Sequence, residues 1–256
     1  MRFLSAAHTD IGITKQINQD SFCLKIAKTP KSNIAFSVLC DGMGGLKKGE
    51  LASSSVVNTF SEWFENVLPG VVDKSDDFNI IISMWKEIII SQGKKIYDYG
   101  HSRGFSLGTT ITAILIINDN YVAVNVGDSR IYKINKKIEQ VTKDHTLVEY
   151  EVQQHKITVE QAKTDSRKNV LLQCIGASTV IKPDFFIGKV DEEDTFLLCS
   201  DGFRHEILDE EMYGVLAPQV LSSEKIMKKS LVDLIELNKS RNEKDNITAV
   251  LIKAIK

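Results

Sequence analysis

Three aspartates stand at the ends of predicted buried strands, where their carboxylates could bind a cation. Asp41 ends the run NIAFSVLCD, Asp201 ends DTFLLCSD, and Asp245 directly precedes NITAVLIKAI. Carboxylates gathered in one cleft repel one another and raise one another's pKa, and a bound divalent cation removes that cost. Ligands that are all oxygen favour Mg²⁺ or Mn²⁺, because zinc more often recruits His and Cys. The glycines after Asp41 and Asp201 let the backbone turn sharply beside an ion.

The elements that must position these aspartates are predicted from apolar periodicity. Short apolar or β-branched runs predict strands at 33–41, 109–118, 121–127, 194–201 and 246–255. Asp119 and Asn120 form the expected two-residue turn of a β-hairpin. Amphipathic helices are predicted at 50–68, 79–97 and 223–238, the last with Ile226, Leu231, Leu234 and Ile235 on its apolar side. Strands and helices do not alternate as in a βαβ series, which favours an α+β fold with largely antiparallel sheets.

Composition narrows the class of protein. The chain has 256 residues, 43% of them hydrophobic, which is ample for a substantial core. Its 32 Lys and Arg nearly balance 34 Asp and Glu, so no net field favours nucleic acid or an anionic membrane. No apolar stretch approaches the roughly 20 residues of a membrane-spanning helix, and the N-terminus lacks a signal-peptide pattern. Four cysteines without CxxC spacing predict reduced, buried thiols in a cytoplasmic protein.

Seven short motifs follow one another along the chain, and their combination is more specific than any single one, because an isolated Asp-Gly commonly marks an ordinary turn. They are NQD at 18–20, DGMGG at 41–45, GTT at 108–110, VGDSR at 126–130, TKDH at 142–145, SDG at 200–202 and DN at 245–246. Together they resemble the PPM, or PP2C-like, family of metal-dependent protein phosphatases, in the style of its bacterial stand-alone members. The resemblance runs from about Ala7 to Ile255 and implies one catalytic domain over residues 1–256.

The resemblance implies a fold and a site. The fold is a β-sandwich of two antiparallel sheets flanked by pairs of α-helices, with a two-metal centre at one end. By this likeness Asp41 bridges two Mn²⁺ or Mg²⁺ ions and the carbonyl of Gly42 binds one of them, while Asp201 and Asp245 bind the other. Asp20 matches an acidic residue that contacts metal-bound water.

The implied activity is hydrolysis of phosphoserine and phosphothreonine in proteins. Two ions can bridge a water, lower its pKa and hold it in line with phosphorus, so that water or hydroxide attacks without a covalent phosphoenzyme. The leaving oxygen needs an acid that the sequence does not identify. Some family members have His after the first Asp-Gly, whereas Met43 stands here and cannot donate a proton.

Three further residues are expected to support the site rather than bind metal. Asn246 and Asp128 are interpreted as structural, with Asp128 hydrogen-bonding a neighbouring turn. His145 is interpreted as a structural partner of Asp144. The resemblance to the family implies these roles for the residues of the matching motifs.

Two departures from the family pattern bear on activity. Lys15 stands where an arginine usually grips the substrate phosphate; lysine keeps the charge but loses the planar bidentate fork. Phe105 stands where bacterial relatives often have an acidic residue of a third, labile metal site. We therefore expect two tightly held ions, with a third weak or absent.

Other readings of the sequence lead to different functions. A cysteine-dependent phosphatase is excluded because four residues separate Cys199 from Arg204, whereas the phosphate loop needs five. A catalytically weak PPM-fold module that binds phosphoproteins is the main alternative, and a hydrolase of small phosphomonoesters is another. Residues 146–178 are expected to form a flap that shapes substrate access. The expected partners are phosphorylated substrates of a Ser/Thr kinase, and the expected state is a monomer.

Overall fold

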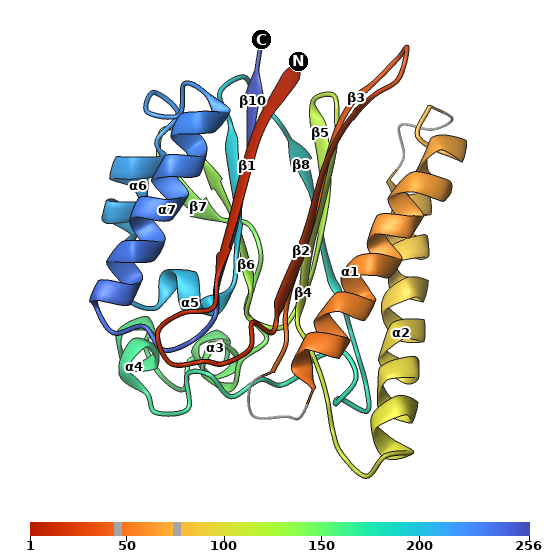
Figure 1. The fold of residues 1–256 in the computed structure, drawn as a ribbon, viewed down its shortest axis with the longest axis vertical. Coiled ribbons are helices and arrows are strands. Elements are labelled where there is room, and N and C mark those ends of the chain that lie inside the picture. Colours follow the sequence, from red (N-terminus) through yellow and green to blue (C-terminus); the bar gives the residue numbers. More distant parts are fainter. Residues whose placement is uncertain (44–47, 74–77) are drawn as a thin grey trace.

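Two five-stranded antiparallel sheets pack face to face in the computed structural model, which describes residues 1–43, 48–73 and 78–256 (Figure 1). One sheet has the order β1-β10-β9-β6-β7 and the other β2-β3-β4-β5-β8. The strands are β1 Arg2–Asp10, β2 Asp20–Lys28, β3 Asn33–Asp41, β4 Ile111–Ile117, β5 Asn120–Val126, β6 Arg130–Ile134, β7 Ile138–Gln140, β8 Asp184–Lys189, β9 Thr195–Cys199 and β10 Ile247–Ile255. All of the pairings within the two sheets are antiparallel, as predicted.

Helices cover the outer face of each sheet, which confirms the predicted layered α+β fold (Figure 1). The pair α1 and α2 lies on the second sheet, and α6 with α7 lies on the first. The helices are α1 Gly49–Asn66, the 3₁₀ turn η1 Leu68–Gly70, α2 Asn79–His101, α3 Leu147–Gln153, α4 Val159–Thr164, α5 Asp201–Arg204, α6 Asp209–Leu216 and α7 Glu224–Ser240. No helix in the described ranges is long and apolar enough to cross a membrane.

Strand β3 shows why the central strands read as continuous apolar runs. Its alternate residues Phe36 and Val38 pack beneath α1 and α2, while Ala35 and Leu39 pack between the sheets. Both faces of the strand are therefore buried, and neither face can be polar as in a half-exposed sheet. The same arrangement holds the end of β3 rigidly, where Asp41 emerges.

Three local predictions are corrected by the structure. The β4–β5 turn is formed by Asn118 and Asp119 rather than by Asp119 and Asn120, since Ile117 pairs directly with Asn120. Asn118 adopts a left-handed conformation (φ 54°), which Asn tolerates, and its side chain accepts a hydrogen bond from the Asn33 amide.

The other two corrections concern helices. Helix α2 continues to His101, four residues beyond the predicted end. In α7 Ile226 is 38% exposed, and the neighbouring Met227 packs in the core instead.

Candidate active site

The first half of the site forms where β2 begins and β3 ends. The antiparallel register places Asp20 directly opposite Asp41. The backbone amide of Asp41 donates to the Thr110 hydroxyl at 2.9 Å, and the Asp41 carbonyl accepts from both the Thr110 amide and the Thr109 hydroxyl. These hydrogen bonds to the two threonines before β4 fix the backbone of Asp41. The Asp41 side chain therefore begins at a fixed point opposite Asp20.

Gly42 lies in a space that excludes any larger residue. A Cβ added there would lie 2.5 Å from the Gly49 carbonyl oxygen and 2.6 Å from that of Gln19. The Gly42 amide donates to the Gln19 carbonyl at 3.1 Å. Gly42 also forms an isolated bridge with Thr109. The last two residues of the DGMGG motif, at 44 and 45, lie outside the described residues.

The second half of the site forms where α5 meets the start of β10. Asp201 is the first residue of α5, separated from β9 by Ser200 alone, and Asp245 lies two residues before β10. Gly202 allows α5 to lie close to the segment before β10. A Cβ at this position would lie 2.2 Å from the Asn246 carbonyl oxygen and 3.3 Å from the Cβ of Asp245. Residues 44 positions apart in the sequence are thereby brought together.

The loop from residue 11 to residue 19 joins the two halves. The Asn246 side chain donates to the carbonyls of Ile11 and Ile17 and accepts from the Gln19 amide at 2.9 Å. This agrees with the supporting role predicted for Asn246. Lys15, in the middle of the loop, places its ammonium nitrogen 2.8 Å from an Asp245 carboxylate oxygen. The pKa of Lys15 is raised: burial lowers it, but the contact with Asp245 and the charges of Asp41 and Asp201 outweigh burial.

Electrostatics couple the carboxylates of both halves. Burial raises the pKa of Asp20 to about 7; the nearby hydroxyls of Thr248 and Ser200 lower it, and the charges of Asp201 and Asp245 raise it further. Burial also raises the pKa of Asp41 well above its ordinary value, with added repulsion from Asp20 and Asp201. Side chains from distant segments therefore share one poorly solvated region, which is the condition that a bound cation relieves.

The carboxylate of Asp128 is coupled to this cluster by charge, whereas the hydrogen bond predicted from it to a neighbouring turn stays a prediction. It is buried just before β6, and its pKa is raised to about 7, by burial first and then by the charge of Asp201. Arg204 opposes that shift and donates to the Asp128 carbonyl at 3.1 Å. The GDSR motif was visible in the sequence, but nothing in it showed that the charges of Asp128 and Asp201 would interact.

Several carboxylate oxygens of the cluster have no hydrogen-bond partner. Both oxygens of Asp20 and one of Asp201 are buried without a hydrogen-bond partner. The hydroxyls nearest Asp20 are engaged elsewhere: that of Thr248 pairs with Thr9, and that of Ser200 accepts from the Thr248 amide. Buried oxygens without donors need a cation or ordered water. Across the described ranges, no three His, Cys, Asp or Glu side chains are arranged closely enough to hold an ion.

His145 is not the partner of Asp144 that the sequence suggested. Asp144 forms a bidentate pair with Arg130, at 2.7 to 3.1 Å, and a longer contact with Arg204. The His145 ring instead accepts from the Gly127 amide at Nδ1 and faces Asp184 across 3.1 Å at Nε2. Gly127 precedes Asp128, so His145 holds the backbone next to Asp128.

The cysteine alternative is excluded by the environment of Cys199. This residue is fully buried in β9, and burial raises the pKa of its thiol to about 12. A nucleophilic cysteine needs a lowered pKa and an accessible sulfur.

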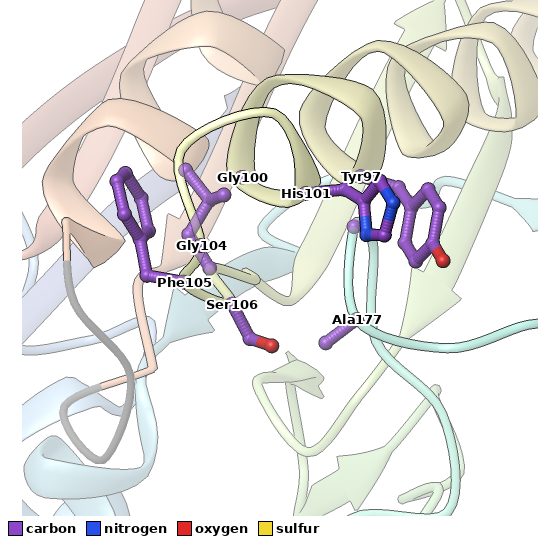
Figure 2. Close-up of a pocket in the computed structure, with 9 residues that line it drawn as sticks. Tyr97, Gly100, His101, Gly104, Phe105, Ser106 and Ala177 are labelled. Atoms are coloured by element: carbon purple, nitrogen blue, oxygen red, sulfur yellow. The ribbon is translucent and has the colours of Figure 1, made fainter.

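A hollow lies at the C-terminal end of α2 (Figure 2). It encloses about 270 Å³, and its lining includes Tyr97, His101, Ser106 and Ala177 but none of the clustered aspartates. The Tyr97 and His101 rings stack with centroids 5.7 Å apart. Phe105 packs edge-on against Tyr99 and offers no oxygen ligand.

Known proteins share both the sequence pattern and the fold. The profile of the family described as protein phosphatase 2C matches residues 12–236. A protein phosphatase 2C-type protein of Streptococcus pyogenes is 32% identical over 95% of this chain and 94% of its own length. The serine/threonine phosphatase stp of Listeria monocytogenes is 31% identical over 87% of this chain and 85% of its own.

Solved structures extend the likeness. The serine/threonine phosphatase Stp1 of Staphylococcus aureus superimposes with a TM-score of 0.83 at 30% identity, covering 98% of this chain and 94% of its own. The catalytic domain of the serine/threonine phosphatase PstP, crystallised with two manganese ions, superimposes with a TM-score of 0.77 at 25% identity over 99% of both chains. The layered sandwich is thus an architecture that this chain shares with solved serine/threonine phosphatases. The chain belongs to the protein phosphatase 2C family.

Proposed function

We propose that this protein hydrolyses phosphoserine and phosphothreonine in other proteins and that it requires two Mn²⁺ or Mg²⁺ ions. One observation carries the proposal: buried aspartates from segments far apart in the sequence meet at one end of the sandwich with unpaired oxygens. Membership of the protein phosphatase 2C family and the names of its relatives support the same activity.

The proposed ligands are the carboxylates of Asp41, Asp201 and Asp245 and the carbonyl of Gly42, with Asp20 holding ordered water beside them. When bound, the ions would supply an activated water and neutralise the charge of the phosphate. A third ion is proposed to be weak or absent, since Phe105 contributes no oxygen, although Asp128 gives Asp201 one neighbouring carboxylate.

Lys15 is proposed to bind the substrate phosphate. Its side chain is 29% exposed at the rim of the cluster, and its ammonium group already lies against an anionic oxygen of Asp245. A phosphate oxygen can take that place, because a charge-assisted hydrogen bond forms with either anion. The ammonium group of lysine is a compact charge, whereas the planar guanidinium of arginine can bind phosphate with two parallel hydrogen bonds. Lysine therefore holds phosphate less rigidly.

The proposed substrates are phosphorylated proteins, opposed by a Ser/Thr kinase. Residues 146–178 carry the two short helices α3 and α4 and are proposed to act as a flap over the substrate. The base of this segment is tied to the site, because Ile175 exchanges two backbone hydrogen bonds with Thr109. We further propose a cytoplasmic monomer; all four cysteines are free, as expected in a reducing compartment.

The decisive experiment measures Mn²⁺-dependent phosphate release from a phosphothreonine peptide and from p-nitrophenyl phosphate. Asp41→Asn and Asp201→Asn should abolish turnover of both, because each removes a charged ligand. Turnover of p-nitrophenyl phosphate alone would point to a small-molecule hydrolase. Peptide binding without turnover would point to a phosphoprotein-binding module.

A further inference from the structure

His205 lies between two carboxylates at the back of the acidic cluster. Its Nε2 is 3.5 Å from an oxygen of Asp201, and its Nδ1 is 3.2 Å from an oxygen of Glu243. All three side chains are largely enclosed, with exposures of 13%, 12% and 7% for His205, Asp201 and Glu243. Neither His205 nor Glu243 belongs to the motifs that identify the site.

Glu243 holds the other ligand loop with its second oxygen. Its Oε1 accepts hydrogen bonds from the backbone amides of Lys244, at 2.7 Å, and Asp245, at 2.9 Å. One carboxylate thus faces His205 on one side and fixes the backbone of Asp245 on the other. The pair His205 and Glu243 therefore connects Asp201 to Asp245 through the protein interior.

The frame around this pair is rigid. The buried side chain of Asn238, in α7, donates to the Phe203 carbonyl at 2.8 Å, and its backbone carbonyl accepts from the Glu243 amide at 3.1 Å. Asn238 therefore connects helix α5, the end of α7 and the loop before β10. A ring held in such a frame has few alternative rotamers, which is what orienting a ligand carboxylate requires.

We infer that His205, braced by Glu243, is a positioning residue that orients Asp201 and Asp245 for metal binding. A histidine N–H directed at one carboxylate oxygen leaves the other free to face an ion. Asp201 shows this division, since its Oδ2 faces His205 while its Oδ1 is buried without a partner. This inference rests on the proposed function, because it presumes that Asp201 and Asp245 are ligands.

The test measures Mn²⁺ affinity by isothermal titration of the metal-stripped full chain, so that no catalytic readout is needed. His205→Phe keeps the ring but removes both nitrogens, and it should weaken Mn²⁺ binding about tenfold, the lower end of losses seen when such supporting groups are removed. His205→Gln retains one N–H donor and should recover most of that loss. His8→Phe is the matched control, because His8 is a partly enclosed histidine on β1 that contacts Lys228.

Unchanged affinity in His205→Phe, or an equal loss in the His8→Phe control, would overturn the inference. Should His205→Phe fail to fold, Glu243→Gln decides instead: its amide oxygen still accepts from the two backbone amides, but the charge facing His205 is lost. Unchanged affinity in that variant would overturn the inference too. A wild-type chain that binds no Mn²⁺ would overturn both this inference and the proposed function, whereas a wild-type chain that binds normally isolates the failure to His205.

Discussion

The middle and the end of strand β3 have opposite effects on the stability of the fold. In the middle, Phe36 stacks on Phe64 with centroids 5.0 Å apart and lies near two tryptophans, entirely shielded from water. Five residues later, Asp41 extends a carboxylate into a region where burial and neighbouring charge both raise its pKa. The first residue stabilises the fold by removing apolar surface from water. The second costs stability when its carboxylate is ionised without a positively charged partner.

The contrast shows that this fold separates stability from chemistry along a single strand. Apolar packing on both faces stabilises the backbone of β3. The strand can therefore carry at its end a carboxylate that lowers the stability of the fold. The charge of Asp41 is coupled to those of Asp20, Asp128 and Asp201, which come from other segments of the chain. Function and stability should therefore respond differently to mutation in the two regions.

The largest effect is expected from Asp41→Asn. Loss of this charge should lower kcat by about a thousandfold or more, as when a preorganised electrostatic group is removed. The metal-free protein should be no less stable, because a raised pKa marks Asp41 as unfavourable in its ionised form. Steady-state kinetics and metal-free thermal melts measure the two effects. Asp119→Asn, at the opposite end of the sheet, is the control and should change neither.

The reverse behaviour is expected from Phe36→Ala. Removing this fully buried ring should lower the free energy of unfolding by about 3–5 kcal/mol, through lost burial and a cavity. Activity per folded molecule should hardly change, since the site lies at the strand end. Urea unfolding followed by tryptophan fluorescence gives the stability, and a loss below about 1 kcal/mol would contradict the role assigned to this core.

The metal-free protein should lose stability as pH rises. Asp20 and Asp128 have a pKa of about 7 in the folded chain and an ordinary value of 3.8, so between these values the folded state binds more protons than the unfolded state. Stability is then greatest at the acidic side of this window and falls toward pH 7. The melting temperature in EDTA should drop by about 5 °C or more between pH 5 and pH 7.5.

Saturating Mn²⁺ should flatten or reverse that pH dependence, because cations replace the protons on the same oxygens. A metal-free melting temperature that stays level or rises from pH 5 to pH 7.5 would show that the carboxylates are not crowded as described.

The smallest effect is expected at Lys15, at the rim of the site. Lys15→Ala should raise KM for a phosphopeptide about tenfold, the value of one charge-assisted hydrogen bond, with a smaller change in kcat. Lys15→Arg should lower KM below that of the wild type, because guanidinium binds phosphate with two parallel hydrogen bonds. Lys94→Ala, on the exposed side of α2, serves as the control. Unchanged KM in both Lys15 variants would reject the phosphate-binding role.

Much of the fold was predictable because the strands and helices have strong local patterns. The run from Asn33 to Asp41 is apolar throughout except for Ser37 and its ends, and the predicted strand matches β3 residue for residue. The predictions for individual positions in turns and at the edges of helix faces were less accurate. The turn at Asn118 shifted by one residue because cross-strand register decided it, and Ile226 lies at the edge of the buried face of α7, where neighbouring positions are interchangeable by periodicity alone.

Residue types and order along the chain were enough to propose an oxygen-ligand cation site and to identify the family. They could not show that the charge of Asp128 couples to the cluster or that His205 contacts both Asp201 and Glu243. Both depend on distances between segments that are far apart in the sequence. Only the folded structure sets those distances and removes the water around them. Charge interactions depend steeply on both separation and solvation, so the chemistry of these aspartates was decided by tertiary structure.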